Sequence, residues 1–279
     1  MFSSWLLMLH YLGYFAAIFI GLSLGIMGGG GSILTVPVLV YLIGVSPVLS
    51  TAYSLFVVGT TSLVGAAGYF RKGLVSVPTA LVFLATSLVT VFLTRKLLMP
   101  AIPHELFTVG GLLFTKDLLV LVAFAALMVL AATSIIRSKE AEVVLDAALH
   151  QPAPGISYPL ILTVGAVVGG LTGFVGAGGG FLIIPALVLF ARLPMQLAVG
   201  TSLTIIAVNS LIGFTGDLSA GTPIAWSFLL GFLAFALVGI VLGTYLARFI
   251  PGQKLKPAFG WFTLAMGAFI LVRELVFKA

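Results

Sequence analysis

Eight long apolar stretches constrain this chain more than any other feature of its sequence. They lie at about residues 5–27, 48–70, 74–94, 117–136, 158–175, 197–216, 224–247 and 257–277, and two shorter apolar runs lie at 33–43 and 181–191. A helix that crosses a bilayer needs about 20 mainly apolar residues, and only 7% of these 279 residues are charged. We therefore predict an all-α integral membrane protein of about ten segments, eight long helices and two short ones that either span or re-enter.

The chain contains an internal repeat. A shift of 148 residues aligns 21–73 with 169–221 without a gap, and 17 of the 53 aligned positions are identical. Many identities are glycine, but an apolar composition does not explain three other pairs: Pro37 with Pro185, Ser54 with Ser202, and Ser62 with Ser210. Repeats of this kind indicate homologous structural units. We predict two membrane repeats, 1–137 and 157–279, joined by a linker at 138–156.

The order of segments predicts that the two repeats are inverted relative to each other. Each has a long helix, a glycine cluster, a short helix and then three more long helices. Whether the short element spans or forms a hairpin with the helix before it, the chain returns to its starting side. Three further crossings end the repeat on the opposite side. Inverted repeats are a recurring transporter architecture, with the binding site between them near the midplane.

Basic residues between the segments predict the orientation. Eight of them share one side of the membrane, namely Arg71, Lys72, Arg137, Lys139, Arg192, Arg248, Lys254 and Lys256, and five share the other, namely Arg95, Lys96, Lys116, Arg273 and Lys278. Cytoplasmic loops carry the excess of Lys and Arg, so the first side is predicted to be cytoplasmic. The chain is then a multi-pass protein of the cell (inner) membrane with both termini outside. The linker is a cytoplasmic connector.

The glycine clusters predict two helix breaks. Gly25–Pro37 reads GIMGGGGSILTVP, and Gly173–Pro185 reads GFVGAGGGFLIIP. Each glycine in a helix interior costs about 1 kcal/mol relative to alanine, and the short helix that follows a break offers unpaired N–H groups to an anion. We predict that both breaks bind one anion near the midplane, through Gly28, Gly29, Gly30, Gly31, Ser32, Gly176, Gly178, Gly179 and Gly180. The alternative is that these glycines only allow close helix packing.

Other polar or irregular positions in the apolar segments complete the candidate site. Pro37 and Pro185 interrupt the short helices, and each is predicted to act as a hinge or helix kink. The preferred side-chain ligands are Ser54, Thr201 and Ser202, with Thr61 and Asn209 second. Hydroxyls and an amide can replace an anion's hydration shell, although they also commonly bond to their own helix or a neighbour. Asp117 and Asp217 lie at segment ends and are expected to be interfacial.

Several function classes find no support in the sequence. The chain has no cysteine, and its three histidines share no motif spacing with carboxylates, so we predict no catalytic residue, no metal site, no cofactor and no enzyme activity. The net charge of +6 comes from residues scattered between apolar runs, which does not indicate a nucleic-acid partner. The glycine motif does not predict dinucleotide binding, because no strand precedes it and no acid follows at the required distance. Few buried acids also argue against a cation carrier.

The motifs resemble a known family. The pattern GxxGxGGGxxxxP at Gly173–Pro185, the sequence AVGTSL at 198–203 and the turn GTPIAW at 221–226 are similar to those of the TauE/SafE sulfite exporter family, an anion permease family of the 4-toluene sulfonate uptake permease superfamily. The first repeat carries the same pattern, with Ser32 in place of the last glycine. The resemblance implies transport of small sulfur-containing anions such as sulfite, sulfoacetate or related organosulfonates, driven by an ion or proton gradient.

These observations lead to one main prediction. It is a secondary transporter that binds a sulfur-containing anion at the paired glycine-rich breaks and works by alternating access. An anion channel would share every feature named so far, and a non-transporting membrane scaffold or sensor is the second alternative. The exact substrate, the direction of transport, the coupling proton or cation and the oligomeric state stay open at this point.

Overall fold

The structure is a computed structural model that describes residues 2–109, 112–137, 158–176, 178–250 and 252–276. The predicted linker at 138–156 lies outside the described residues. The first repeat contains α1 (Phe2–Met27), α2 (Gly30–Pro37), the π-helix η1 (Val38–Leu42), α3 (Pro47–Arg71), α4 (Val77–Leu93), the π-helix η2 (Thr94–Leu98), α5 (Met99–Ala101), β1 (Glu105–Val109), β2 (Leu112–Thr115) and α6 (Lys116–Arg137). The second contains α8 (Tyr158–Val175), α9 (Gly180–Leu189), α10 (Met195–Ser219), α11 (Trp226–Leu246), the 3-10 turn η4 (Ala247–Phe249) and α12 (Gly252–Val276).

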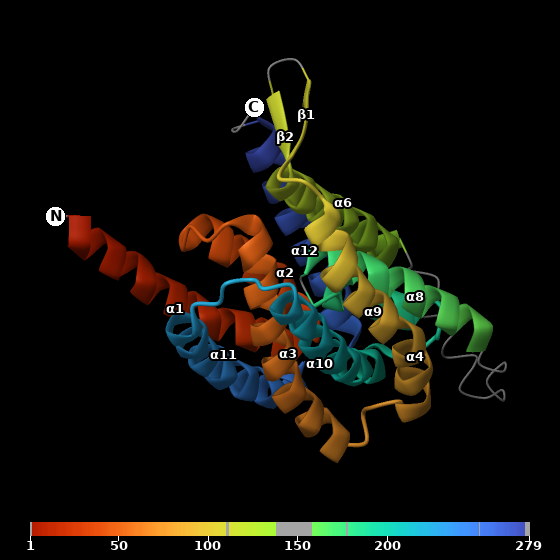
Figure 1. Cartoon of the computed structure of the whole chain (residues 1–279). Helices are drawn as coiled ribbons and strands as arrows, with labels where there is room; N and C mark the ends of the chain where they lie inside the picture. Colours follow the sequence, from red (N-terminus) through yellow and green to blue (C-terminus); the bar gives the residue numbers. More distant parts are fainter. Residues whose placement is uncertain (1, 110–111, 138–157, 177, 251, 277–279) are drawn as a thin grey trace.

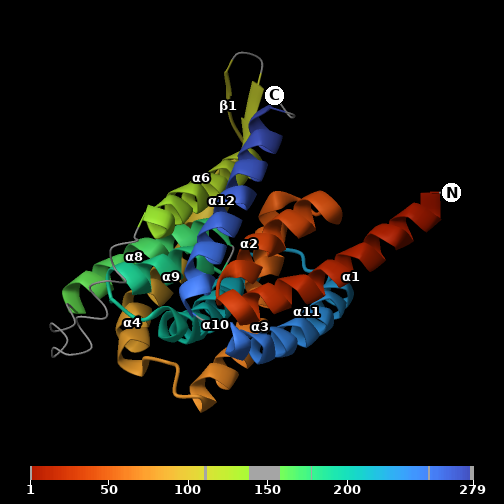
Figure 2. The ribbon, with the colours of Figure 1, turned by 180° about the vertical axis from the view of Figure 1, so that it is seen from behind.

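The predicted all-α membrane fold is confirmed. Six helical spans are long and apolar enough to cross a membrane: 47–71, 77–101, 116–137, 195–219, 226–249 and 257–275. Shorter apolar helices at 12–27, 30–42, 159–175 and 180–189 complete the ten predicted segments. The antiparallel hairpin β1–β2 departs from the prediction, and it projects from the helical body beside the C-terminal end of α12 (Figures 1 and 2).

Equivalent helices of the two repeats pack antiparallel. Leu55, near the start of α3, lies against Gly213, near the end of α10, whereas Gly65 late in α3 faces Leu203 early in α10. The α6–α12 pair has the same arrangement. The rotation axis that relates two antiparallel helices is perpendicular to them, so equivalent helices of the two repeats run in opposite directions. The predicted inversion of the repeats is therefore confirmed.

The first helix of each repeat packs along the fourth helix of the other. α1 lies along α11, and its equivalent α8 lies along α4 (Figures 1 and 2). Gly21 and Gly25 of α1 come against the backbone of α11, and Gly169 and Gly173 of α8 come against that of α4. Without side chains at these positions, the helix backbones approach closely. These four glycines thus serve helix packing.

The chain reverses at the first glycine cluster. Gly13 in α1 lies against Ile43 after η1, and Gly31 at the start of α2 lies against Ile20 and Leu24 of α1. Contacts in this reversed order mean that α1 and α2 form an antiparallel helical hairpin. The short helix of the first repeat is therefore the returning arm of that hairpin.

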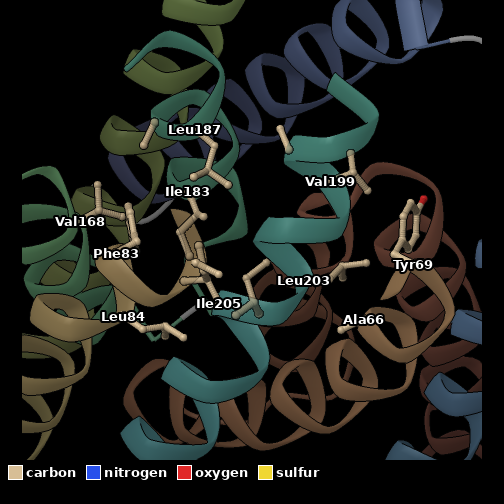
Figure 3. Close-up of a cluster of buried hydrophobic side chains, with 14 of the residues drawn as sticks. Ala66, Tyr69, Phe83, Leu84, Val168, Ile183, Leu187, Val199, Leu203 and Ile205 are labelled. Atoms are coloured by element: carbon tan, nitrogen blue, oxygen red, sulfur yellow. The ribbon is translucent and has the colours of Figure 1, made fainter. Parts of the chain in front are cut away.

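A buried apolar core surrounds α10 and positions the candidate site. Val199, Leu203 and Ile205 of α10 lie among side chains of α3, α4, α8 and α9 (Figure 3). Phe83 from α4 and Ile183 from α9 belong to the same cluster. Because apolar contacts cover α10 on several sides, polar atoms on this helix are shielded from solvent. Any unpaired polar group along α10 thus needs an explanation.

Candidate functional site

The predicted helix breaks occur at glycines with left-handed backbone conformations. Gly28 has φ +70°, and Gly176, Gly178 and Gly179 have φ +68°, +67° and +73°. Residues with a side chain rarely adopt these angles, whereas glycine does so readily. The chain leaves the helical path at Gly28, between α1 and α2, and again between α8 and α9.

The two clusters meet in the interior. A Cβ added to Gly180 would lie 2.5 Å from the Cα atom of Gly29, and a Cβ added to Gly29 would lie 2.6 Å from the carbonyl carbon of Gly180. The Ser32 hydroxyl donates to the Gly29 carbonyl at 2.7 Å and lies beside Gly180. The starts of α2 and α9, which follow Gly29 and Gly179, therefore adjoin.

Five glycines form what we call the glycine column: Gly28, Gly29, Gly180, Gly178 and Gly176. Gly28 contacts Val199 and Ser202 near the start of α10, Gly180 contacts Ile206, and Gly178 contacts Ile206 and Ser210 further along it. Gly176 lies beside Thr51 and Arg95, and Arg95 pairs with Asp217 near the end of α10. The column thus follows α10 through several turns, so the two breaks are staggered along this helix.

Three buried serines of α3 and α10 have no hydrogen-bond partner among the described residues. They are Ser54 and Ser62 of α3 and Ser210 of α10, whose Oγ atoms are unpaired among the described residues. Ser62 and Ser210 are equivalent in the two repeats. Desolvating a polar group without a new bond typically costs about 1–3 kcal/mol. A ligand that accepts their hydrogen bonds would offset that cost.

Other predicted ligands already bond within the protein. The Thr61 hydroxyl donates to the Val57 carbonyl at 2.6 Å, and the Ser202 hydroxyl donates to the Val199 carbonyl at 2.8 Å. Thr201 Oγ1 accepts a bond from the backbone N–H of Ser76 at 2.9 Å. These bonds fit the structural alternative for hydroxyls in membrane helices. Ser202 lies beside Gly28, whereas Thr201 is hydrogen-bonded to the loop between α3 and α4.

Asn209 joins α10 to α4. Its side-chain oxygen accepts from the Ser87 hydroxyl at 3.1 Å, and its amide nitrogen lies 3.0 Å from the same Oγ atom. We expect Asn209→Ala to destabilise the protein by about 1–3 kcal/mol, because it leaves the buried Ser87 hydroxyl unpaired. Thermal unfolding in detergent checks this, with Thr133→Val as the control because Thr133 bonds only its own helix. Equal melting of the two variants would contradict the role.

The two prolines lie inside the short helices, as predicted. The π-helix η1 begins directly after Pro37, at Val38. Proline lacks the N–H that an α-helix needs, so a change of helix type at this point has a local cause. α9 continues as an α-helix from Pro185 to Leu189. The change of helix type therefore distinguishes the first repeat from the second.

Arg95 and Asp217 form a buried ion pair that the sequence analysis missed. Arg95 Nη1 lies 3.4 Å from Asp217 Oδ1, and the two side chains are 1% and 8% exposed. The same nitrogen donates to Thr51 Oγ1 at 3.0 Å. We predicted Arg95 as a loop charge and Asp217 as an interfacial residue. Both lie near helix ends, but the packing of α8, α10 and η2 removes them from solvent.

Lys116 is a second correction to the predicted loop charges. This first residue of α6 is 7% exposed, and its Nζ atom donates to the Met99 carbonyl. The neighbouring Asp117 accepts from the backbone N–H of Val48 at 3.1 Å, at the start of α3. A carboxylate in this position stabilises the start of a helix. Lys116 and Asp117 therefore form part of the packed structure.

No group of three or more His, Asp or Glu side chains that could hold a metal occurs within the part of the chain that the structure describes.

Comparison with known families identifies the family of this chain: the profile described as "Sulfite exporter TauE/SafE" matches residues 13–270. The chain belongs to the TauE/SafE sulfite exporter family. This TauE/SafE protein is accordingly a multi-pass membrane transporter. No solved structure matches it.

Relatives of this TauE/SafE protein carry transporter names. A "Probable membrane transporter protein" of Xylella fastidiosa is 28% identical over 258 residues, which cover 91% of this chain and 92% of the relative. YdhB of Bacillus subtilis is 32% identical over 120 residues, or 43% of this chain and 48% of its own. YunE of the same organism is 34% identical over 87 residues, covering 31% and 32% of the two chains. Both are named probable membrane transporter proteins.

Proposed function

We propose that this TauE/SafE protein moves small sulfur-containing anions, sulfite or an organosulfonate, across the cell (inner) membrane. The observation that carries the proposal is the glycine column with the unpaired hydroxyl of Ser210 beside Gly178, together with the unpaired hydroxyls of Ser54 and Ser62 on α3, the helix that packs against α10. Hydroxyl and backbone N–H donors can replace the water around an anion, and the starts of α2 and α9 add favourable helix dipoles. A small oxyanion is the ligand that suits such a set of donors.

We propose alternating access as the mechanism. The glycine column is buried from end to end, so an anion bound beside it would be shielded from solvent in this conformation. Tyr69 lies at the Gly28 end, where its hydroxyl donates to the Gly25 carbonyl at 3.1 Å, and Arg95 lies at the Gly176 end. Rocking of one inverted repeat against the other would open these ends in turn.

The proposed orientation places both termini outside and the 138–156 linker in the cytoplasm. An inside-negative potential is worth about 2.3 kcal/mol per charge per 100 mV. Export of an anion is then electrically downhill, whereas import needs a co-transported proton or cation. Counter-flow measurements on proteoliposomes separate a carrier from an anion channel, because only a carrier is stimulated by substrate on the opposite side.

Ser210→Ala tests the site. The hydroxyl is buried and unpaired, so its removal should leave thermal stability equal or higher, as expected when an unsatisfied polar group is deleted. We expect sulfite affinity to fall roughly three- to tenfold, because one donor near Gly178 is lost. Purified full-length protein is titrated with sulfite, thiosulfate, sulfate, sulfoacetate, taurine, acetate and chloride, and ligand-induced stabilisation is measured by thermal unfolding.

Thr61→Val is the matched control, because the Thr61 hydroxyl bonds to its own helix. It should leave anion affinity unchanged. If Ser210→Ala binds every anion as the wild type does, Ser210 is not a ligand. If no anion stabilises the wild-type protein and none is transported in proteoliposomes, the membrane scaffold alternative replaces the transporter proposal.

A further inference from the structure

The Arg95 guanidinium has one occupied side and one free edge. Nη1 makes two hydrogen bonds, with Thr51 Oγ1 at 3.0 Å and Asp217 Oδ1 at 3.4 Å. Nε and Nη2 have no hydrogen-bond partner among the described residues, although the side chain is only 1% exposed. Nε and Nη2 together form the edge of a guanidinium that can hold two oxygens of one anion. A buried, unused edge of this kind points to an oxyanion ligand.

The Nη2 end of the free edge lies against the glycine column. A Cβ added to Gly176 would overlap Arg95 Nη2, so the absence of a side chain at this position makes room for the guanidinium. Ser54 follows Thr51 by one helical turn on α3, and its hydroxyl is also unpaired. Residues three apart lie on the same face of a helix. Ser54 and Arg95 are therefore both placed toward the Gly176 end of the column.

The fold does not require a charge at this place. With the 148-residue shift of the repeat, Arg95 corresponds to Gly243 and Asp217 corresponds to Tyr69. At the other end of the column, the Tyr69 hydroxyl donates to the Gly25 carbonyl, and Gly243 packs against α1. The equivalent position is thus filled by neutral groups. A buried ion pair is also weak support for stability, because desolvation offsets its attraction.

Asp217 is the negatively charged partner of Arg95, and two lysines nearby are positively charged. Asp217 Oδ2 has no hydrogen-bond partner among the described residues. Lys116 of α6 contributes a positive charge felt by both members of the pair, and it bonds to Met99. The Lys96 side chain is exposed and lies over the Phe92 ring. Among the described residues, Arg95 is thus a cation in contact with the column, and Asp217 is its counterion.

We propose that Arg95 is a binding residue for the substrate oxyanion at the Gly176 end of the column, and that Asp217 is the carboxylate with which the substrate competes. The inference rests on the proposed function, since it names the residue that recognises the transported anion. Two substrate oxygens accept from Nε and Nη2, and the negative charge of the substrate competes with that of Asp217, which pairs with Nη1, for the same guanidinium. A chloride ion has no pair of oxygens to match this edge, so the site selects oxyanions over halides.

Two substitutions with opposite expected signs test the proposal. Arg95→Gln should weaken sulfite and sulfoacetate binding roughly tenfold or more, because a bidentate charge-assisted contact is lost. Asp217→Asn should tighten binding of the same anions roughly three- to tenfold, because the competing charge is removed while the amide still occupies the space. Dissociation constants are measured by calorimetry on the purified full-length protein, with sodium chloride as the halide comparison. A merely structural ion pair predicts that both variants weaken binding.

Further variants keep the test decisive if Asp217→Asn folds poorly. The double variant Arg95→Gln with Asp217→Asn removes both charges, and it should bind as weakly as Arg95→Gln alone. Arg95→Lys keeps the charge without the two-nitrogen edge, so it should lose the preference for oxyanions over chloride. Lys96→Gln, the exposed neighbour, should leave affinity unchanged.

The outcomes separate this inference from the function on which it rests. Wild-type affinity in Arg95→Gln or in the double variant would overturn the role of Arg95 while leaving the transporter proposal intact. Equal weakening in Arg95→Gln and Asp217→Asn would overturn the competition. Absence of any anion binding and transport by the wild-type protein would instead remove the proposed function itself.

Discussion

Gly180→Ala is expected to separate the two glycine clusters and to lower the melting temperature of the purified protein strongly. The new Cβ would lie 2.5 Å from Gly29 Cα and 2.9 Å from Ile206 Cδ1. The first of these atoms belongs to the backbone, so it can move only if α2 moves away from α9. Overpacking of a tightly packed interior typically costs about 1–3 kcal/mol or more. The loss follows from steric overlap alone, because Gly180 has no left-handed φ.

Gly170→Ala is the matched control for this prediction. Gly170 lies in α8, and a Cβ added there meets no atom within 4 Å. Alanine is the better helix former, so this variant should melt at the wild-type temperature or above it. Fluorescence-detected size-exclusion chromatography after heating measures both proteins in the same detergent. If the two variants melt together, the clusters do not meet as the structure describes.

Gly176→Ala is expected to damage both stability and anion binding. The added Cβ would overlap Arg95 Nη2 and the Thr51 side chain, and the residue has φ +68°. The left-handed conformation costs a residue with a side chain roughly 1–2 kcal/mol, and the displaced guanidinium adds to that. We expect a large fall in melting temperature together with the loss of sulfite-induced stabilisation.

A double substitution divides these contributions. Arg95→Ala in the Gly176→Ala background removes the overlapping group, so it should recover part of the stability without restoring binding. Residues in direct contact commonly show coupling of about 0.5–3 kcal/mol in such cycles. Gly221→Ala controls for the backbone, because Gly221 has φ +79° but no atom within 4 Å of an added Cβ. Additive effects of Gly176→Ala and Arg95→Ala would rule out the described contact.

The stagger of the glycine column matters for the proposed anion site, because the two ends of the column have different neighbours. Gly28 lies beside Ser202 and Gly176 lies beside Arg95, near opposite ends of α10. Gly178 and its neighbour Ser210 lie between these neutral contacts at one end and the arginine at the other. This difference in charge between the two ends would favour entry of an oxyanion at the Arg95 end. Uncharged hydroxyl donors along the column would bind the anion weakly enough for it to dissociate. Full charges at both ends would hold the anion more tightly and slow its release.

The apolar segments, the repeat and the helix breaks follow from the sequence by itself. Lipid leaves the backbone only internal partners, so stretches such as 117–136 must be helical. Four consecutive glycines from Gly28 to Gly31 disfavour a continuous helix. The odd number of crossings per repeat requires inversion. These conclusions depend on local chemistry and on counting, and the antiparallel packing of α3 with α10 confirms the inversion.

Which polar groups have a hydrogen-bond partner depends on contacts between distant segments. Arg95 precedes Lys96 at the end of an apolar segment, and such a pair looks the same in sequence whether it is exposed or buried. Here the packing of η2 against α8 and α10 buries the first and exposes the second. Asn209 likewise became a helix link because Ser87, 122 residues away, lies opposite it. Burial and hydrogen bonding across helices depend on contacts between distant segments, and a single sequence carries no local signal of those contacts.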